Sequence, residues 1–499
     1  MAEFVVALDQ GTTSSRAIVF NKKGEPISTA QYPLKNFFPQ PGWVEQDPME
    51  ILRTQFSAFR DAVKKANIST SDILAVGITN QRETTVLWDK ATGKPVHNAI
   101  VWQCRRTGDI CRRLEAEGMK NYIHQTTGLI LDPYFSGTKI QWILENVSGA
   151  VEQAKRGKLL FGTVESWIIW NLTGEHLTDF SNAGRTMLFD ISRMRWDATI
   201  CQCLHIPMQM LPQPVSNTGL YGYIKTGIPG LEEFSGIPIR GAIGDQQSAL
   251  LGQGCLEKGE AKNTYGTGCF TLMNMGSDSV RSESGLLTSI AWNINGITNY
   301  ALEGSAFNAG SSIQWLRDEL GLISTAHECD VLAESVEDTG GVYTVSAFTG
   351  LGAPYWDADA RGVIVGITRG TTKAHIARSV LEGIAYQVSD LLKIMELDGG
   401  TKLEALRVDG GAAVSDFLMQ FQADILRRPV HRPETVEITA LGAAFLAGYS
   451  AGLWKELSDV RELIKINHAF KPGISADEAQ KKMDGWHKAV VRSRNWILD

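Results

Sequence analysis

Short apolar runs separated by polar turns dominate the start of the chain and predict a series of β-strands. Residues 4–8 and 17–20 are apolar and rich in β-branched side chains, which is typical of buried strands. The polar stretch at residues 21–25 predicts a turn before a third strand at residues 26–32. The chain is therefore expected to begin as a β-meander.

A helix is predicted to follow this meander. Asp47 precedes Pro48 where apolar residues begin to recur with helical spacing, and a capping carboxylate followed by proline is a common helix start. This helix is expected to end near Ala66. Residues 73–78 and 84–88 predict two further strands, so strands and helices alternate as they do in α/β folds.

The opening pattern recurs near the middle of the chain. Residues 261–275 are predicted to form a strand, a loop rich in glycine and threonine, and a second strand. A later strand at residues 405–408 leads into Asp409-Gly410-Gly411, and a helix is expected to follow. We interpret this recurrence as an internal duplication of an α/β unit, with domains at residues 1–250 and 251–499 and a cleft between them.

The composition narrows the class of protein. A chain of 499 residues with 43% hydrophobic and 21% charged residues is typical of a globular enzyme with two large domains. The net charge of −7 disfavours nucleic acid or an anionic membrane as the main partner. No apolar run reaches the roughly 18 residues of a membrane span. We expect a cytoplasmic protein, since no signal peptide is apparent and the 7 cysteines contain no C-x-x-C pair.

The loop between the first two strands is a candidate phosphate site. Residues 9–16 read Asp-Gln-Gly-Thr-Thr-Ser-Ser-Arg. Gly11 allows close approach of the backbone, hydroxyls donate to phosphate oxygens, and Arg16 can bind phosphate with two hydrogen bonds. Asp9 could hold Mg²⁺ directly or through water. The chain contains neither G-x-x-x-x-G-K-[ST] nor G-x-G-x-x-G, so a nucleotide would have to use a different scaffold from the usual ones.

Later segments could complete a nucleotide site. The loop at residues 264–270 offers hydroxyls and amides from the second unit, and Gly411 allows close approach to a nucleoside. The segments 303–305 and 310–315 are expected to open a helix whose N-terminus points at the nucleotide. The alternative is a face of small residues on which this helix packs against a sheet.

A mixed set of hydrogen-bond donors and acceptors predicts a second pocket. Arg82 and Glu83 lie between two predicted strands, and hydroxyl groups of a polyol need both kinds of partner; a solvated loop is the alternative. Trp102 could stack on a short carbon chain, and Tyr134 supplies a phenol. Asp245 follows an apolar run, where it could act as a general base, cap a helix, or do both.

These motifs resemble the FGGY family of carbohydrate kinases, which has the actin-like ATPase fold, and the resemblance covers essentially the whole chain. Residues 134–146 and 362–382 look like the two signatures of the family. Further segments are similar to family members that act on glycerol: 42–45, 79–85, 102–106, 263–269 and 348–356.

The resemblance implies two duplicated ribonuclease H-like domains and ATP-dependent phosphorylation of glycerol to sn-glycerol 3-phosphate, the first step of glycerol utilisation. It also implies roles for individual residues. The glycerol site would comprise Arg82, Glu83, Trp102, Tyr134, Asp245, Gln246 and Phe270, with Asp245 as the catalytic base. The ATP site would comprise Thr12, Thr13, Ser14, Arg16, Thr267, Gly310, Gln314, Gly411 and Ser415, and Asp9 and Asp245 would hold Mg²⁺.

The chain departs from the family pattern at two places. Ser415 stands where the family often has asparagine, and serine is shorter and carries no amide. Residues 225–240 differ from the arginine-containing loop that binds fructose 1,6-bisphosphate in some relatives, and they include no histidine of the kind that is phosphorylated in others. Neither form of control is therefore expected. Relatives form dimers and tetramers, so a homodimer or homotetramer is expected here.

Two other functions stay open at this point. A kinase for another polyol or a ketose would use the same phosphate loops. An ATP-driven assembly protein or chaperone of the actin-like group would share the fold. The polyol set around Arg82 and the absence of a charged peptide-binding tail favour the kinase.

Overall fold

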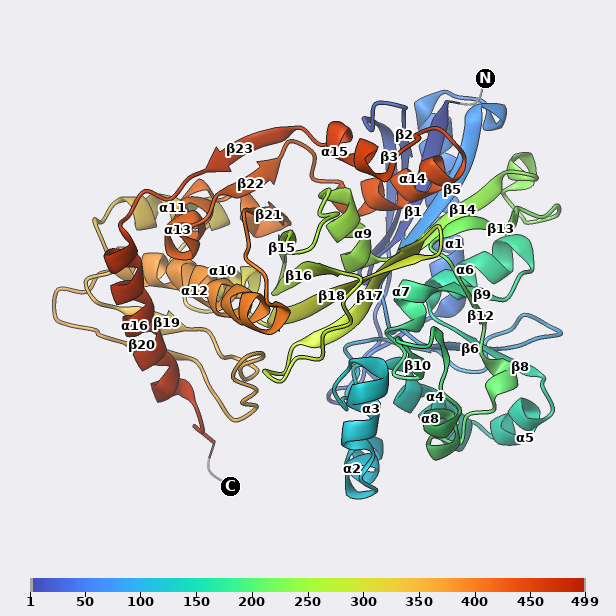
Figure 1. Ribbon diagram of the computed structural model, residues 1–499, viewed down its shortest axis with the longest axis horizontal. Coiled ribbons are helices and arrows are strands. Elements are labelled where there is room, and N and C mark those ends of the chain that lie inside the picture. The colour runs from blue at the N-terminus through green and yellow to red at the C-terminus, as the bar shows by residue number, and fades with distance from the viewer. Residues whose placement is uncertain (1–2, 498–499) are drawn as a thin grey trace.

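The computed structural model describes residues 3–497 and shows two lobes, each built on one large sheet (Figure 1). The first half of the chain forms the lobe at the right of the figure, and most of the second half forms the lobe at the left. The sheet of the first lobe has six strands in the order β13-β14-β5-β1-β2-β3. Their bounds are Phe4–Gln10 for β1, Ser14–Phe20 for β2, Pro26–Pro33 for β3, Ile73–Asn80 for β5, Thr218–Tyr223 for β13 and Pro238–Gly244 for β14.

The second sheet has seven strands and repeats the central pairings of the first. Its order is β17-β18-β16-β15-β21-β22-β23. Just as β1 pairs antiparallel with β2 and parallel with β5, β15 pairs antiparallel with β16 and parallel with β21. The recurrence seen in the sequence therefore corresponds to a repeated topology. The strand bounds are Ala261–Tyr265 for β15, Cys269–Gly276 for β16, Leu287–Ile294 for β17, Ile297–Ala306 for β18, Leu406–Asp409 for β21, Val430–Pro433 for β22 and Ile466–Phe470 for β23.

Helices flank these sheets, and shorter elements connect them. The longer helices are α1 Pro48–Ala66, α2 Gly108–Ala116, α3 Met119–Thr127, α4 Ser136–Asn146, α6 Val164–Thr173, α9 Asp245–Gly252, α10 Gly310–Asp318, α11 Ala326–Glu334, α12 Lys373–Gly399, α13 Asp416–Leu426, α14 Ile438–Ser450 and α16 Ala476–Ser493. The short helices are α5 Ala150–Lys155, α7 Phe180–Ala183, α8 Ala198–Cys203 and α15 Val460–Leu463. The short strands are β4 Glu45–Gln46, β6 Val86–Asp89, β7 Ala99–Ile100, β8 Leu159–Gly162, β9 Leu177–Asp179, β10 Phe189–Asp190, β11 Arg195–Trp196, β12 Gln213–Val215, β19 Tyr343–Val345 and β20 Val363–Val365.

The predicted meander and first helix are confirmed. The carboxylate of Asp47 accepts a hydrogen bond from the backbone N–H of Met49 at 2.9 Å, and Pro48 is the first helical residue of α1. Because proline has no N–H to leave unpaired, it suits this position. The helix ends at Ala66, and the capping residue Asn67 adopts the left-handed conformation with φ +53°.

Helices α9 and α14 pack closely and link the two lobes. Although α14 comes late in the chain, it lies on β1 and β5 of the first sheet (Figure 1). Glycines make this contact possible: a Cβ at Gly77 would lie 2.1 Å from the carbonyl oxygen of Ala443, and one at Gly442 would lie 2.1 Å from that of Ser248. The second half of the chain thus contributes a helix to the first lobe, and the domain boundary near residue 250 stays a prediction.

One helix start expected from the sequence is wrong. Glu303 and Ser305 lie in β18, which pairs with β16 on one side and β17 on the other, and α10 begins only at Gly310. Pairing on both edges outweighs the weak strand preference of this glycine-containing segment. The correction matters because it places the side chain of Glu303 in the sheet, where it meets residues of the first lobe.

Among the helices within residues 3–497, none is long and apolar enough to cross a membrane. The seven cysteines of the chain are free thiols. Six of them are buried, and Cys203 is partly exposed.

Candidate functional site

The carboxyl ends of three neighbouring strands bring the candidate residues together. Strands β1, β5 and β14 run parallel, so their carboxyl ends meet at one edge of the first sheet. Asp9 lies near the end of β1, Arg82 and Glu83 follow β5, and Asp245 follows β14. Residues far apart in the sequence thus converge at this edge.

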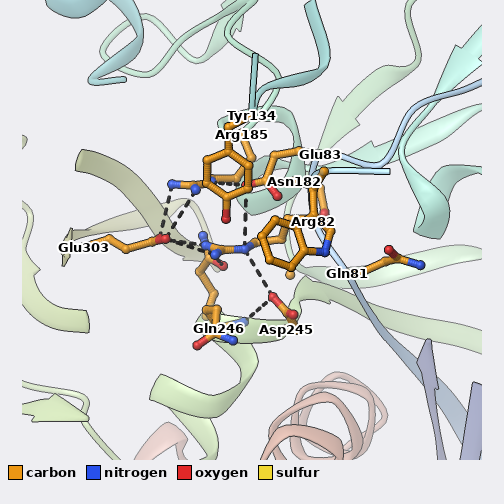
Figure 2. Close-up of polar contacts among 12 residues, drawn as sticks. Gln81, Arg82, Glu83, Tyr134, Asn182, Arg185, Asp245, Gln246 and Glu303 are labelled. Carbon is orange, nitrogen blue, oxygen red and sulfur yellow. Dashed lines mark hydrogen bonds and ion pairs between the residues drawn. The ribbon is translucent and has the colours of Figure 1, made fainter. Parts of the chain in front are cut away.

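A buried ion-pair network centres on Arg82 (Figure 2). Its Nη1 and Nη2 bind Oε2 and Oε1 of Glu303 at 2.7 and 3.0 Å, and its Nε lies 3.2 Å from Oδ1 of Asp245. Arg185 donates from Nε to Oε1 of Glu83 at 2.6 Å, and its Nη1 lies 3.2 Å from Oε2 of Glu303. Both arginines and both glutamates are almost fully buried. Such burial is tolerated because each charge has a partner.

Two members of this network were not recognised in the sequence. Arg185 follows α7 without a recognisable motif, and Glu303 was assigned to the start of a helix. A usable signal for Glu303 is the apolar run at residues 300–302 directly before it, because a glutamate that continues a buried strand needs a cationic partner. No comparable local signal marks Arg185, which lies 118 residues from Glu303 in the sequence.

Asp245 is the most accessible carboxylate of this network, with 31% of its side chain exposed. It is the first residue of α9, whereas Gly244 is the cap, so the sequence interpretation of Asp245 as a cap is wrong. Desolvation by the surrounding protein raises the pKa of Asp245 to about 6. The positive charge of Arg82 opposes this shift, and the negative charge of Glu83 adds to it. In contrast, the two arginines outweigh burial at Glu303 and lower its pKa to about 2.

An aromatic wall stands beside these charges. The ring centroid of Trp102 lies 5.5 Å from that of Tyr134 and 6.4 Å from that of Phe270. The guanidinium of Arg185 lies 5.4 Å from the Tyr134 ring centroid, and the two side chains are adjacent in Figure 2. The indole Nε1 of Trp102 donates to Oγ1 of Thr12 at 2.9 Å. This bond connects the aromatic wall to the first hairpin loop.

Two glutamines hold the carbonyl groups of that first loop. Gln46 donates from Nε2 to the carbonyl oxygen of Thr12 at 2.7 Å, and Gln81 donates to that of Gly11 at 3.2 Å. Gln81 also donates to Oε1 of Gln46 at 2.8 Å. Thr13 at the tip of the loop is exposed, and Thr12 and Ser14 are partly exposed. The two glutamines therefore hold the loop through its backbone carbonyl groups, while the residues that carry its hydroxyl groups are accessible to solvent.

Arg16 lies between two carboxylates. It donates to Oδ2 of Asp9 and, at 3.0 Å, to Oε2 of Glu437, which precedes α14. The negative charge of Asp9 is the main reason that the pKa of Arg16 is raised. This pairing orients the guanidinium toward the edge of the sheet where the first loop lies. In addition, the contact with Glu437 ties the loop to a helix from the second half of the chain.

The acidic residues fit a Mg²⁺ ion that enters with a nucleotide. Within residues 3–497, no three metal-ligating side chains form a cluster that could hold a metal by themselves. Mg²⁺ ordinarily needs only one or two carboxylates, because phosphates and water supply the other ligands. Oδ1 of Asp9 makes no hydrogen bond to a described residue, and Asp245 is accessible, so both carboxylates could serve.

The second hairpin loop borders a cavity of about 340 Å³. Its lining includes Thr267, Gly310, Gln314 and Gly411, which are four of the residues predicted to contact ATP. Gly310 packs tightly there, since a Cβ at this position would lie 2.7 Å from the carbonyl oxygen of Gly266. A cavity of this volume is large enough for a nucleoside.

Ser415 is engaged within the protein. Its Oγ accepts a hydrogen bond from the backbone N–H of Leu418 at 3.0 Å and caps α13. The same hydroxyl donates to Oδ1 of Asp330 at 2.6 Å. Because these bonds use its only proton, contact of Ser415 with a nucleoside stays a prediction.

A buried polar cluster supports the loops of the site. Asn182 and Asn80, the last residue of β5, exchange side-chain hydrogen bonds of 3.0 and 3.1 Å. Ser181 accepts from the N–H of Gly244, the last residue of β14, at 3.0 Å. Both α7 side chains bond to the carboxylate of Asp179. The ends of β5 and β14 are therefore tied to one another through α7.

Glu165 is expected to make stability depend on pH. Its carboxylate is fully buried and accepts from Asn80 at 3.1 Å. Burial, together with Asp179, raises its pKa from 4.5 to about 7. When a carboxyl group has a higher pKa in the folded than in the unfolded protein, its contribution to stability is complete at pH values below the unfolded-state pKa. This contribution is lost as the pH rises through the folded-state pKa. Between pH 5 and 8, wild type should therefore lose about 1 to 3 kcal/mol more stability than Glu165→Gln.

Urea unfolding at both pH values measures this difference. The matched control is Glu175→Gln, which replaces an exposed glutamate and should keep the wild-type pH dependence. Equal pH dependence in wild type and Glu165→Gln would contradict the assignment.

Both halves of the chain match models of one protein family. The N-terminal domain of the FGGY family of carbohydrate kinases matches residues 4–252, and the C-terminal domain of that family matches residues 261–451. A glycerol kinase from Alkaliphilus oremlandii is 55% identical to this chain, covering 99% of this chain and 98% of its own. Glycerol kinase 1 from Clostridium tetani is 56% identical, covering 99% of both chains.

Solved structures give the same result for the fold. The crystal structure of Plasmodium falciparum glycerol kinase with ADP has a TM-score of 0.94 at 37% identity and covers 98% of both chains. A xylulose kinase from Lactobacillus acidophilus has a TM-score of 0.88 at 22% identity, covering 97% of this chain and 96% of its own, and bears on the fold alone. The fold class expected from the sequence is confirmed.

Proposed function

The chain belongs to the FGGY family of carbohydrate kinases, and we propose that it phosphorylates glycerol with ATP, giving sn-glycerol 3-phosphate and ADP. One observation carries this proposal: Arg82, Glu83 and Asp245 lie together beside an aromatic wall. They do so in a chain that is about 55% identical to glycerol kinases along its whole length. Asp245, whose carboxyl group has a pKa of about 6, is the solvent-accessible member of these three residues.

The pocket around Arg82 suits a small polyol. Glycerol hydroxyls donate and accept hydrogen bonds, and Arg82 donates while Glu83 and Asp245 accept. The bidentate contact with Glu303 holds the Arg82 guanidinium in one orientation before the substrate arrives. The rings of the aromatic wall, Trp102, Tyr134 and Phe270, would cover the carbon chain, and Gln246 adds an amide at the pocket edge.

In the proposed reaction, a terminal hydroxyl oxygen of glycerol attacks the γ-phosphorus of ATP. A new oxygen–phosphorus bond forms while the bond from the γ-phosphorus to the β–γ bridging oxygen breaks, and ADP leaves with that oxygen. The hydroxyl proton passes to the carboxylate of Asp245. Since a pKa of about 6 leaves this group ionised at neutral pH but still basic, it is well matched to the role.

Alignment and charge neutralisation are the main demands of phosphoryl transfer. The loop hydroxyls of Thr12, Thr13 and Ser14, together with Arg16, would hold phosphates from the first lobe, and Thr267 would hold them from the second. When bound, Mg²⁺ would neutralise phosphate charge next to Asp9 and Asp245. Closure of the lobes around both substrates would exclude water and limit ATP hydrolysis.

The nucleotide cavity can be tested by filling it. Gly411 lines the cavity and a Cβ there would meet no atom within 4 Å, so a larger side chain is expected to occupy part of the cavity. Gly411→Leu is expected to raise the ATP KM by about tenfold or more, with the glycerol KM and the melting temperature near wild type. Steady-state kinetics measures this effect.

The matched control for Gly411→Leu is Gly370→Leu. Gly370 lies outside the cavity, and its Cβ would come no closer than 3.9 Å to another residue. An unchanged ATP KM in Gly411→Leu would contradict the prediction that the nucleoside binds in this cavity.

ADP release across several acceptors tests the function itself. Strong stimulation by glycerol, and weaker stimulation by dihydroxyacetone, erythritol or xylulose, is the expected result. Preference for one of the other acceptors would indicate a different polyol or ketose kinase. Polymerisation, or turnover stimulated by peptides and not by polyols, would indicate an actin-like assembly protein or chaperone.

A further inference from the structure

Lys262 is a buried lysine between the acceptor pocket and the second phosphate loop. It lies on β15, and its Nζ donates to Oγ1 of Thr264 at 2.8 Å and to Oε1 of Gln246. Thr264 is two residues before the loop, and Gln246 is next to Asp245 (Figure 2). Both acceptors are partly exposed, although Lys262 itself is fully buried. The ammonium thus lies directly beneath the surface that these two side chains form.

Within residues 3–497, no carboxylate pairs directly with the Lys262 ammonium. Arg82 and Arg185 each form ion pairs with glutamates, whereas Lys262 forms no salt bridge to any residue within 3–497. Lysine has three N–H donors, and the two acceptors at Lys262 are neutral. Burying a charge without a counter-charge is strongly unfavourable. One N–H donor of Lys262 therefore has no hydrogen-bond partner among residues 3–497 and could be offered to an anion that binds at this place.

Another buried lysine provides a contrast. Lys139 donates to the backbone carbonyl oxygens of Tyr134 and Phe135, which are fixed parts of the fold next to α4. The partners of Lys262 are instead side chains at the two sites between which a phosphoryl group would move. Burial lowers the pKa of Lys262, and the carboxylates of Asp409 and Asp245 oppose this shift. A bound phosphate would act in the same direction as these carboxylates and favour the charged form.

We propose that Lys262 is a further catalytic residue, whose Nζ donates a hydrogen bond to a non-bridging oxygen of the γ-phosphoryl group during its transfer. The ammonium would stabilise the negative charge on that group as the bond to ADP breaks and the bond to the acceptor oxygen forms. Lys262 neither gains nor loses a proton, so the hydroxyl proton still passes to Asp245. The inference rests on the proposed function, because it takes ATP as the phosphate donor.

Lys262→Met tests this inference, because methionine is of similar length and has no charge. The turnover number should fall by about 10²- to 10³-fold, with the glycerol KM within about threefold of wild type. Calorimetry gives a second readout that does not depend on turnover. The Kd of a non-hydrolysable ATP analogue with Mg²⁺ should rise by about tenfold or more, while the Kd of ADP should stay the same. A purely structural role would affect both nucleotides or neither.

Two variants complete the experiment. Lys258→Met removes an exposed lysine that pairs with Asp278 and should match wild type in both readouts. Lys262→Arg keeps the charge and should retain more activity than Lys262→Met. If Lys262→Met does not fold, Lys262→Gln replaces it, and the Kd of the ATP analogue should again rise while the Kd of ADP stays the same. Equal losses for the analogue and ADP, or no loss for either, would overturn the assignment. Failure of the proposed function would be separate, because wild type itself would then release no ADP with glycerol.

Discussion

Asp245→Asn is expected to lower the turnover number by about 10²- to 10⁴-fold, the usual range for loss of a general base. Asparagine has nearly the same shape as aspartate, but its neutral amide cannot take the hydroxyl proton. The amide oxygen can still accept from the N–H of Gln246, as the carboxylate does at 2.7 Å. Arg82 keeps its bidentate contact with Glu303, so the buried network should survive the substitution.

ADP release at saturating glycerol and ATP measures this effect, and thermal unfolding checks that the variant is folded. The glycerol KM should change much less than the turnover number, because the amide still offers an acceptor to a hydroxyl. Asp318→Asn, which alters an exposed aspartate paired with Arg317, is the matched control and should behave as wild type. Near-normal turnover in Asp245→Asn would remove Asp245 from the role of base.

Arg82→Ala is expected to lower kcat/KM for glycerol by about 10²-fold or more, mainly through a higher glycerol KM. A hydrogen bond from a charged donor contributes about 1.5 to 3 kcal/mol, and 1.4 kcal/mol corresponds to about tenfold in affinity. The substitution also leaves Glu303 with Arg185 as its remaining cationic partner. Loss of one partner from a buried pair costs about 3 to 5 kcal/mol, so the melting temperature should fall as well.

Arg82→Lys separates these two effects. Lysine keeps the charge next to Glu303 but lacks the planar fork of the guanidinium, so stability should recover more than glycerol affinity. Arg60→Ala is the control, because Arg60 is exposed and pairs with Asp61 on α1. If the glycerol KM were unchanged in both Arg82 variants, the proposed acceptor pocket would be in the wrong place.

Much of the fold could be predicted from the sequence, because the relevant signals are local. The alternation of apolar and polar residues marks β1, β2 and β5, and the Asp47-Pro48 pair marks the start of α1. The family was also correctly identified from its motifs. The roles of individual site residues stay predictions, although the structure brings most of them to the sheet edge around Arg82 or to the cavity beside Gly411.

The sequence by itself determined the secondary structure around the two hairpins, the repeat and the family, since each depends on apolar spacing, turn residues or contiguous motifs. Only the tertiary structure decided which charges meet. Arg82 and Glu303 are 221 residues apart, and their contact depends on how β18 of one lobe faces the end of β5 in the other. The same holds for Lys262, whose two neutral hydrogen-bond acceptors are identified only once its neighbours are in place. Ion pairing between distant segments leaves no periodic trace in a sequence, because it depends on where burial removes water.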